Sequence, residues 1–400
     1  SHMPGFEIFG KEERDEVNDV LESGVLMRYG FDGMRNGHFK AKEFELRFAE
    51  LMKSSYAQLT SSGTSALTVA LASAGIGAGD EVIMPTFTFV ASFESILALG
   101  AVPILCDVDD TLCLDPEAVK KLVSPKTKAI MPVHMCGSMA DLAGLKRICE
   151  DHNLLLVEDA SQALGAKYQD IFVGNYGDLG CFSFDFVKTI TCGEGGGIIT
   201  NNKIFAENAD KYQDHGHDHS GNDRGAETHP FMGYNFRISE LHAAVGLGQL
   251  KKFDQIMSKQ QENFNILRTI LEPIPQVEFR RVPKGGMENG AFLSFFLPNE
   301  ELARKTIATI SAAGIDACFY WFDNNWHYYR KWEHLKEKKS LSPLSSEIKN
   351  QLQDFSTTDF SQSDHWIGRT ISCLIKIGWT EAEMKTRAEK IANAITTAVS

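Results

Sequence analysis

Residues 154–162 read Leu-Leu-Leu-Val-Glu-Asp-Ala-Ser-Gln, an apolar run that ends in two carboxylates. A short continuous apolar run predicts a strand that is buried on both faces, as in a parallel sheet. Burial of a carboxylate is costly unless the group meets a cation, so Asp159, at the carboxyl end of this strand, is a candidate ligand-binding group. A helix N-cap after the strand is the alternative role of Asp159.

Similar β-rich runs alternate with helix-length segments over the first half of the chain. Besides 154–157, the runs are 58–59, 81–84, 102–105, 129–133, 180–184 and 197–200. The alternation predicts an α/β fold with a mostly parallel, seven-stranded sheet and helices on both faces. Ligands of such sheets bind at the carboxyl ends of the strands, so the site is expected there.

The second half of the chain has a different pattern, which predicts a smaller α+β domain. Its expected elements, after a polar stretch at 214–230, are a helical run from Ser239 to Glu272, strands at 290–297 and 315–321, and helices at 300–313 and 381–399. We predict a large domain over residues 1–255 and a small one over 256–400. Residues 1–3, Ser-His-Met, are interpreted as the remnant of an expression tag.

Composition excludes several classes of protein. The formal net charge of -13 argues against a nucleic-acid partner, because a phosphate backbone is neutralised by clustered Lys and Arg. No apolar stretch approaches the roughly 20 residues of a membrane span, so no membrane partner is expected. The eight cysteines lack the close paired spacing of a zinc site, which favours buried free thiols in a reducing cytoplasm.

Lys188 lies between the apolar run 181–184 and the glycine-rich segment 193–197. Desolvation there would lower the pKa of its amine and make it nucleophilic, whereas a solvated surface lysine is the alternative. Residues 60–65, Thr-Ser-Ser-Gly-Thr-Ser, precede an Ala-rich helix and predict either a phosphate cup or a simple helix cap. Neither Walker A nor a Gly-x-Gly-x-x-Gly fingerprint is present in the sequence.

Seven segments, in this order, resemble the sugar aminotransferases of the DegT/DnrJ/EryC1/StrS family. They are Ser62–Thr64, Pro85–Ser92, Glu158–Gln162, Phe182–Phe184, Lys188, Gly193–Gly196 and Gly233–Arg237. The resemblance covers nearly the whole chain. It implies the type I pyridoxal-5′-phosphate (PLP)-dependent transferase fold, that of aspartate aminotransferase. Some relatives are sugar dehydratases with histidine in place of the lysine, so Lys188 favours an aminotransferase.

The resemblance also implies a role for individual residues. Lys188 would bond covalently to the aldehyde carbon of the cofactor, and Asp159 would pair with the pyridine nitrogen. Gln162 would lie near the phenolic oxygen, and Phe89 would stack on the ring. The implied phosphate ligands are Gly63, Thr64, Ser65 and Ser183, together with Asn235 of a second subunit in a homodimer with shared active sites.

Four segments outside the cofactor motifs resemble the branch of the family that forms 8-amino-3,8-dideoxy-manno-octulosonate for lipopolysaccharide. They are residues 27–36, 134–139, 214–219 and 324–328. This implies L-glutamate as amino donor and 3,8-dideoxy-8-oxo-manno-octulosonate as acceptor. The alternatives are amination of a nucleotide-linked keto sugar, PLP-dependent dehydration of such a sugar, and a catalytically silent PLP-binding regulator.

The substrate contacts expected from the sequence are less specific. The candidates are His215, His217, Arg237, Trp326 and His327. The alternation of His215, His217 and His219 with Asp214 and Asp218 leaves a metal site, a polar substrate loop and a solvated loop open, and we expect the substrate loop without a metal. A guanidinium binds a carboxylate with two parallel hydrogen bonds, and the candidates for this are Arg28, Arg35, Arg224, Arg237 and Arg369.

Overall fold

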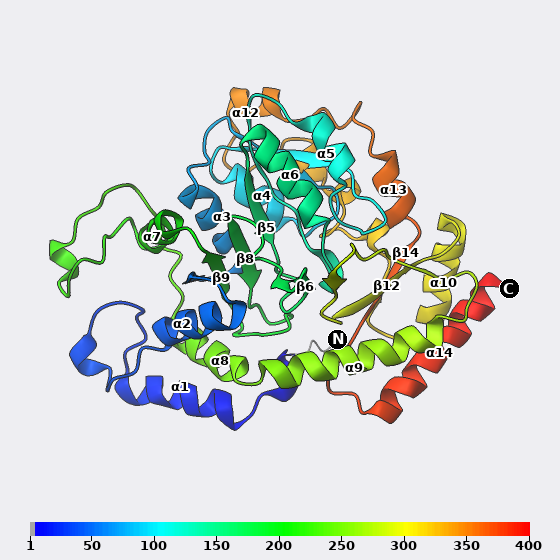
Figure 1. Ribbon diagram of the computed structural model, residues 1–400, viewed down its shortest axis with the longest axis horizontal. Coiled ribbons are helices and arrows are strands. Elements are labelled where there is room, and N and C mark those ends of the chain that lie inside the picture. The colour runs from blue at the N-terminus through cyan, green and yellow to red at the C-terminus, as the bar shows by residue number, and fades with distance from the viewer. Residues whose placement is uncertain (1–4) are drawn as a thin grey trace.

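A seven-stranded sheet forms the centre of the molecule in the computed structural model, which describes residues 5–400 (Figure 1). The strands follow the order β1-β9-β8-β5-β4-β2-β3. Their bounds are β1 Tyr56–Thr60, β2 Glu81–Pro85, β3 Val102–Cys106, β4 Thr127–Ile130, β5 Leu155–Asp159, β8 Leu179–Ser183 and β9 Gly196–Thr200. The interpreted tag remnant, residues 1–3, lies outside the described residues.

The sheet is mostly parallel, as predicted. The β2–β3, β2–β4, β4–β5 and β5–β8 pairs are parallel, and only β9 runs against its neighbours β8 and β1. Nearly all side chains of β3, β5 and β9 are buried, which explains why these strands appear in the sequence as continuous apolar runs. The carboxyl ends of β1, β2, β5 and β8 therefore meet at one edge of the sheet.

Helices that connect the strands pack against this sheet. They are α3 Gly63–Ser73, α4 Ala91–Leu97, α5 Pro116–Leu122, α6 Leu142–His152 and α7 Lys203–Tyr212. The Ser62 hydroxyl caps α3 by accepting a hydrogen bond from the Ser65 N–H, so the helix begins directly after β1. Helix α3 packs on β8 and β9, and its N-terminus lies at the carboxyl edge of the sheet.

Helices α1 (Lys11–Ser23) and α2 (Lys40–Met52) pack on α8 (Glu240–Leu250). The predicted single helix from Ser239 to Glu272 is divided, because Lys252 leaves the helical conformation and α9 (Phe253–Leu271) starts anew. The Lys252 amine lies 2.9 Å from a Glu13 carboxylate oxygen, which anchors this turn to α1. Helices α8 and α9 run across the lower part of the molecule in Figure 1.

A four-stranded antiparallel sheet, β10-β12-β14-β13, lies in the second half of the chain. Its strands are β10 Glu278–Phe279, β12 Phe292–Phe296, β13 Cys318–Phe319 and β14 Thr370–Leu374, and it packs with α9, α10 (Glu300–Ala312) and α14 (Glu381–Val399). The strand predicted over 315–321 is confined to β13, because Trp321 already begins a 3-10 turn. The boundary at residue 255 stays a prediction.

The remaining elements are short. They are α11 Glu333–Lys336, α12 Ser346–Gln351, α13 Ser361–Ile367, the small sheet of β6 Lys167–Tyr168, β7 Ile171–Phe172 and β11 Gly286–Met287, and 3-10 turns at Gly5–Ile8, Asp32–Met34, Met135–Gly137, Arg224–Ala226, Trp321–Asp323 and Tyr329–Lys331. Within residues 5–400, no helix is both long and apolar enough to cross a membrane. All eight cysteines are free thiols, and only Cys318 among them is not fully buried.

Candidate active site

A cavity of about 120 Å³ lies where the segments after β1, β2, β5 and β8 meet. It brings together seven of the residues predicted for cofactor binding, which are Gly63, Thr64, Phe89, Asp159, Gln162, Ser183 and Lys188. Residues that had no individual role in the sequence analysis, although they lie in the segments quoted there, also line it, among them Thr88, Met135, Ser161 and Glu194. The parallel strands explain the convergence, because they deliver distant segments to one edge.

Asp159 is buried at the base of this cavity, with 5% of the residue exposed. Its Oδ2 accepts a hydrogen bond from the Ser92 hydroxyl at 3.1 Å, and its Oδ1 accepts one from the Ser161 N–H at 3.2 Å. Among residues 5–400, no cationic side chain lies within ion-pair distance of this carboxylate. A protonated pyridine nitrogen would supply the cation that a buried carboxylate requires.

Ser92 is a contact that sequence reasoning missed. The Thr88 and Ser92 hydroxyls lie 2.6 Å apart, so the two side chains form a chain that ends on Asp159. The signal was present in the segment 85–92, since two hydroxyl residues four positions apart lie on the same face of a helical turn. Nothing in the sequence, however, indicated that this face meets β5.

The neighbouring carboxylate, Glu158, points away from the cavity, because successive residues of a strand face opposite sides of the sheet. Glu158 is fully buried, and its Oε1 lies 2.9 Å from Nε2 of His134. Its two oxygens also accept hydrogen bonds from the backbone N–H groups of Gly174, Tyr176 and Gly177. Glu158 therefore holds the loop before β8 in place, while Asp159 faces the site.

The turn after β1 has the form of an anion cup. The first N–H groups of α3 have no partner within the helix and are free to meet an anion. A Cβ at Gly63 would lie 2.6 Å from Cβ of Ser183, so only glycine allows this approach of the two segments. Ser65 is different, because its hydroxyl is engaged with the Ser62 backbone and the residue does not line the cavity. The predicted phosphate contact of Ser65 stays a prediction.

Lys188 lines the same cavity on the segment after β8. His327 lies beside it, and burial together with the positive charge of Lys188 lowers the pKa of this imidazole to about 3. His327 is held by Nδ1 at 2.9 Å from Oδ1 of Asn324, and its carbonyl accepts the Thr88 N–H. A neutral imidazole thus borders the candidate nucleophile.

Aromatic side chains form the outer wall. The Phe89 and Trp326 rings are stacked with centroids 5.8 Å apart, and both side chains are partly exposed. Trp321, Tyr328 and Tyr329 are buried and belong to the core. Of the aromatic stretch that follows β13, Trp326 and His327 are therefore the members nearest to the cavity mouth.

Asn235 and Arg237 do not reach this cavity within one chain. Asn235 forms a bridge with Asp214, and its Oδ1 accepts the Arg237 N–H at 3.2 Å. The Arg237 guanidinium bonds to Oδ1 of Asp214 at 2.8 Å. The contact of Asn235 with the cofactor of a second subunit stays a prediction.

The three histidines of the 214–219 segment diverge. His215 is exposed, the Nδ1 atom of His217 lies 3.0 Å from Nε2 of His229, and His219 lies between Asp210 and Asp214 at 2.6 Å from each. The segment is not extended, because His215 and His219 adopt positive φ. In the described part of the chain, no group of three or more side chains could hold a metal ion.

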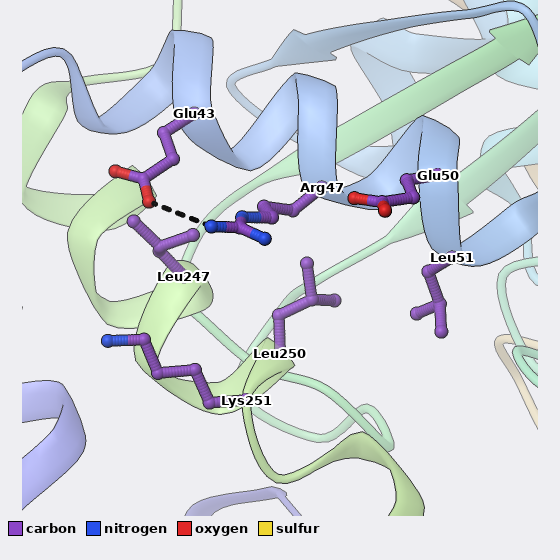
Figure 2. A pocket seen from close by; sticks show the side chains of 7 residues that line it. All are labelled: Glu43, Arg47, Glu50, Leu51, Leu247, Leu250 and Lys251. Carbon is purple, nitrogen blue, oxygen red and sulfur yellow. Dashed lines mark ion pairs between the residues drawn. The ribbon is translucent and has the colours of Figure 1, made fainter.

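A larger cavity, about 450 Å³, lies between α2 and α8 (Figure 2). Figure 2 shows Arg47 turned towards Glu43, with their charged atoms 4.0 Å apart, beside Leu247 and Leu250. This cavity holds none of the predicted site residues and no nucleophile other than Lys251 at its rim. The chemistry of the chain is thus concentrated in the smaller cavity at the carboxyl edge of the sheet.

The fold and the smaller cavity define the class of PLP enzymes with the aspartate aminotransferase fold. Residues 7–359 match the DegT/DnrJ/EryC1/StrS aminotransferase family, and the chain belongs to this family. It is a PLP-dependent sugar aminotransferase, as the sequence analysis predicted.

Individual relatives agree with this membership. The chain is 33% identical to GDP-perosamine synthase of Vibrio cholerae over 84% of this chain and 88% of that protein. It is 36% identical to L-glutamine:2-deoxy-scyllo-inosose aminotransferase of Streptomyces kanamyceticus over 75% of this chain and 71% of that protein. A crystal structure of an aminotransferase from Psychrobacter cryohalolentis superposes with a TM-score of 0.83 at 26% identity and covers 98% of both chains.

Proposed function

We propose that the protein transfers an amino group from L-glutamate to the aldehyde of 3,8-dideoxy-8-oxo-manno-octulosonate. The product would be 8-amino-3,8-dideoxy-manno-octulosonate, for lipopolysaccharide. The observation that carries amino transfer is the cavity in which Lys188, Asp159 and the Ser62–Thr64 turn meet. The eight free thiols support a reducing cytoplasm as its location.

Asp159, Lys188 and the supporting Ser92 each have a part in this proposal. The chemistry that PLP supplies when bound is delocalisation of negative charge from the carbon that carries the transferred amine. Asp159 would keep a proton on the pyridine nitrogen, and Ser92, by donating to Asp159, would keep that carboxylate ionised. The Lys188 amine would anchor the cofactor and then take and return the proton of the donor Cα.

The placement of the four segments outside the cofactor motifs supports the octulosonate as acceptor. Met135, of the segment 134–139, lines the cavity, and His327, of 324–328, borders Lys188. The other two segments meet each other, because the Tyr29 and His219 rings stack at 4.1 Å. Two of the four segments thus border the cofactor cavity, and the other two meet each other although they lie far apart in the sequence.

We also propose a homodimer with shared active sites. Met232 is 90% exposed and Tyr234 is 59% exposed, and both lie within the three residues before Asn235. Exposed apolar side chains on a projecting segment are typical of a surface that another chain covers. The segment between α7 and α8 projects from the body in Figure 1, which agrees with such a contact.

The second candidate is amination of a nucleotide-linked keto sugar, which the likeness to GDP-perosamine synthase favours. PLP-dependent dehydration of such a sugar is disfavoured by Lys188. A silent PLP-binding regulator is disfavoured because the residues predicted for catalysis meet in one cavity.

Two experiments test the proposal. Purified protein should show the absorbance band of lysine-bound PLP, and Lys188→Ala should abolish the band, while Lys203→Ala, at an exposed lysine, should keep it. The oxidised octulosonate and nucleotide-linked 4-keto sugars should then be compared with labelled glutamate as donor. Absence of turnover with the octulosonate, beside turnover of a nucleotide-linked sugar, would replace the first candidate by the second.

A further inference from the structure

A second polar cavity, about 240 Å³, lies between the segment that joins α1 to α2 and the segment that follows α7. Its walls include Arg28, Tyr29, Lys42, His219, Arg224 and Glu227. The two walls come from positions nearly 200 residues apart. The cofactor motifs include none of the residues that line this cavity, which we call the Tyr29 pocket.

Cations gather around the Tyr29 ring. The guanidinium carbons of Arg28 and Arg224 lie 4.5 and 5.6 Å from the ring centroid, and the His219 ring stacks on it at 4.1 Å. Burial lowers the pKa of His219, but the hydrogen bonds to Asp210 and Asp214 outweigh it and raise the pKa to about 9. His219 is therefore a cation at neutral pH.

Hydrogen-bonding groups in the Tyr29 pocket lack partners. Nε of Arg28 and Nη1 of Arg224 are shielded from solvent and meet no acceptor among the described residues. Oε2 of Glu227 is equally shielded and accepts no hydrogen bond there, although it lies 3.2 Å from Nδ1 of His217. Buried polar groups are normally paired, so free donors and a free acceptor in one pocket indicate a ligand that offers both.

The charge of the pocket narrows the kind of ligand. The cations are balanced by carboxylates behind them, since Glu45 pairs with Arg28 and Asp214 with Arg224. Asp32 and Glu227 add negative charge to the lining. Attraction by net charge is therefore weak, and recognition would depend on hydrogen bonds. A polyhydroxylated acid provides an oxyanion for the arginines and a hydroxyl for Glu227, whereas an inorganic anion provides only the first.

The pocket is connected to the active site through β1. One Glu45 oxygen binds Arg28 at 2.5 Å, and the other accepts the Leu59 N–H at 2.9 Å. Three residues after Leu59 the chain reaches Ser62, which lines the cofactor cavity. A single buried carboxylate, Glu45, thus connects the Tyr29 pocket with the strand that leads to the cofactor cavity.

We propose that the Tyr29 pocket binds the carboxylate end of the sugar acceptor, with Arg224 and Arg28 as the oxyanion donors and Lys42 at the rim. This inference rests on the proposed function. It also selects among the five arginines that the sequence left open. Of the five, only Arg28 and Arg224 line the Tyr29 pocket, whereas Arg35, Arg237 and Arg369 do not.

Calorimetric binding to the PLP-loaded enzyme tests this assignment. The probes are 3-deoxy-manno-octulosonate, which has a hydroxyl in place of the 8-aldehyde and so cannot be aminated at C8, and its methyl ester. We expect the acid to bind at least about tenfold more tightly than the ester, because charge-assisted hydrogen bonds are lost on esterification. In Arg224→Gln, affinity for the acid should fall about tenfold and the difference between acid and ester should disappear.

Two further variants guard against a folding artefact. Lys42→Gln changes an exposed residue that forms no ion pair within residues 5–400. It should lower the affinity of the enzyme for the acid severalfold. Arg281→Gln removes an exposed arginine paired with Asp109 and Asp110, far from the pocket in the fold, and should bind like the unchanged enzyme. Unchanged affinity of both Arg224→Gln and Lys42→Gln for the acid would overturn the inference.

The failure of the inference is distinguishable from that of the proposed function. If glutamate does not convert the bound cofactor to its amine form, the proposed function fails. If the octulosonate aldehyde is aminated with the same KM in Arg224→Gln and Lys42→Gln, the proposed function stands and the pocket assignment is wrong. Loss of binding of a nucleotide-linked keto sugar in these variants, without binding of the acid, would also overturn the assignment.

Discussion

The His219→Gln substitution should make the thermal stability of the protein less dependent on pH. The two carboxylates that hold His219, Asp210 and Asp214, raise its pKa from 6.5 to about 9. A raised pKa means that the folded state binds the proton more tightly than the unfolded chain. The stabilisation is therefore fully present below pH 6.5 and is lost as the pH rises through 9.

The size of this stabilisation follows from the rise in the pKa of His219 on folding. A change of one pKa unit corresponds to about 1.4 kcal/mol, so the shift gives an upper value of about 3 kcal/mol, which solvent screening reduces to roughly 2 kcal/mol. With an unfolding entropy of about 2.1 cal/mol/K per residue, a chain of 400 residues has about 0.8 kcal/mol/K. We expect the variant to melt about 2–3 °C below the unchanged protein at pH 6.

Differential scanning fluorimetry at pH 6 and pH 10 provides the measurement. At pH 10 the imidazole is neutral in both states, so the difference in Tm between variant and unchanged protein should shrink to less than about 1 °C. His38→Gln is the matched control, because its Nδ1 lies 3.7 Å from Asp19 in an exposed pair and should contribute little. A Tm difference that is the same at both pH values would refute the assigned role of the imidazolium.

Three further substitutions test the cofactor cavity and its support. Gly63→Ala should weaken PLP binding about tenfold or more, because the new Cβ would lie 2.6 Å from Ser183. Titration of PLP absorbance measures this affinity, and an unchanged value would show that the turn can move to accept the Cβ. Ser92→Ala should slow amino transfer about tenfold and shift the pH profile of kcat, because Asp159 loses a hydrogen-bond donor. A changed Tm with an unshifted pH profile would indicate that Ser92 has a structural role only. Glu158→Gln should lower the Tm by about 4–6 °C. The reason is that a single amide oxygen cannot replace two carboxylate oxygens, which together meet His134 and three backbone N–H groups. An unchanged Tm would contradict this account.

Much of the large sheet and of the candidate site could be predicted from local sequence. Continuous apolar runs located the strands, and the ends of those runs located Asp159 and Lys188. The prediction was weaker where structure depends on distant partners. The helix predicted through Lys252 is interrupted at a turn whose Lys252 amine meets the distant Glu13, and strand β14 escaped notice although it is central in the smaller sheet.

The polar clusters illustrate the same difference. The spacing of His215, His217 and His219 left a metal site open, because spacing alone does not specify backbone conformation. Positive φ at His215 and His219 separates the rings and directs His219 to Tyr29. No local signal could have paired these two residues, since the pairing depends on how the segment after α7 folds back on α2.

The amino-acid sequence by itself determined the chemistry that is available: a lysine beside glycines, a carboxylate at the end of an apolar strand, and a hydroxyl-rich turn before a helix. These are properties of short segments, in which backbone preference and hydrophobicity act over a few residues. Tertiary structure decided which groups meet, including the support of Asp159 by Ser92 and the joining of Arg28 and Arg224 around Tyr29. Such meetings depend on the packing of elements far apart in the chain, because burial brings them together only after the whole sheet has formed.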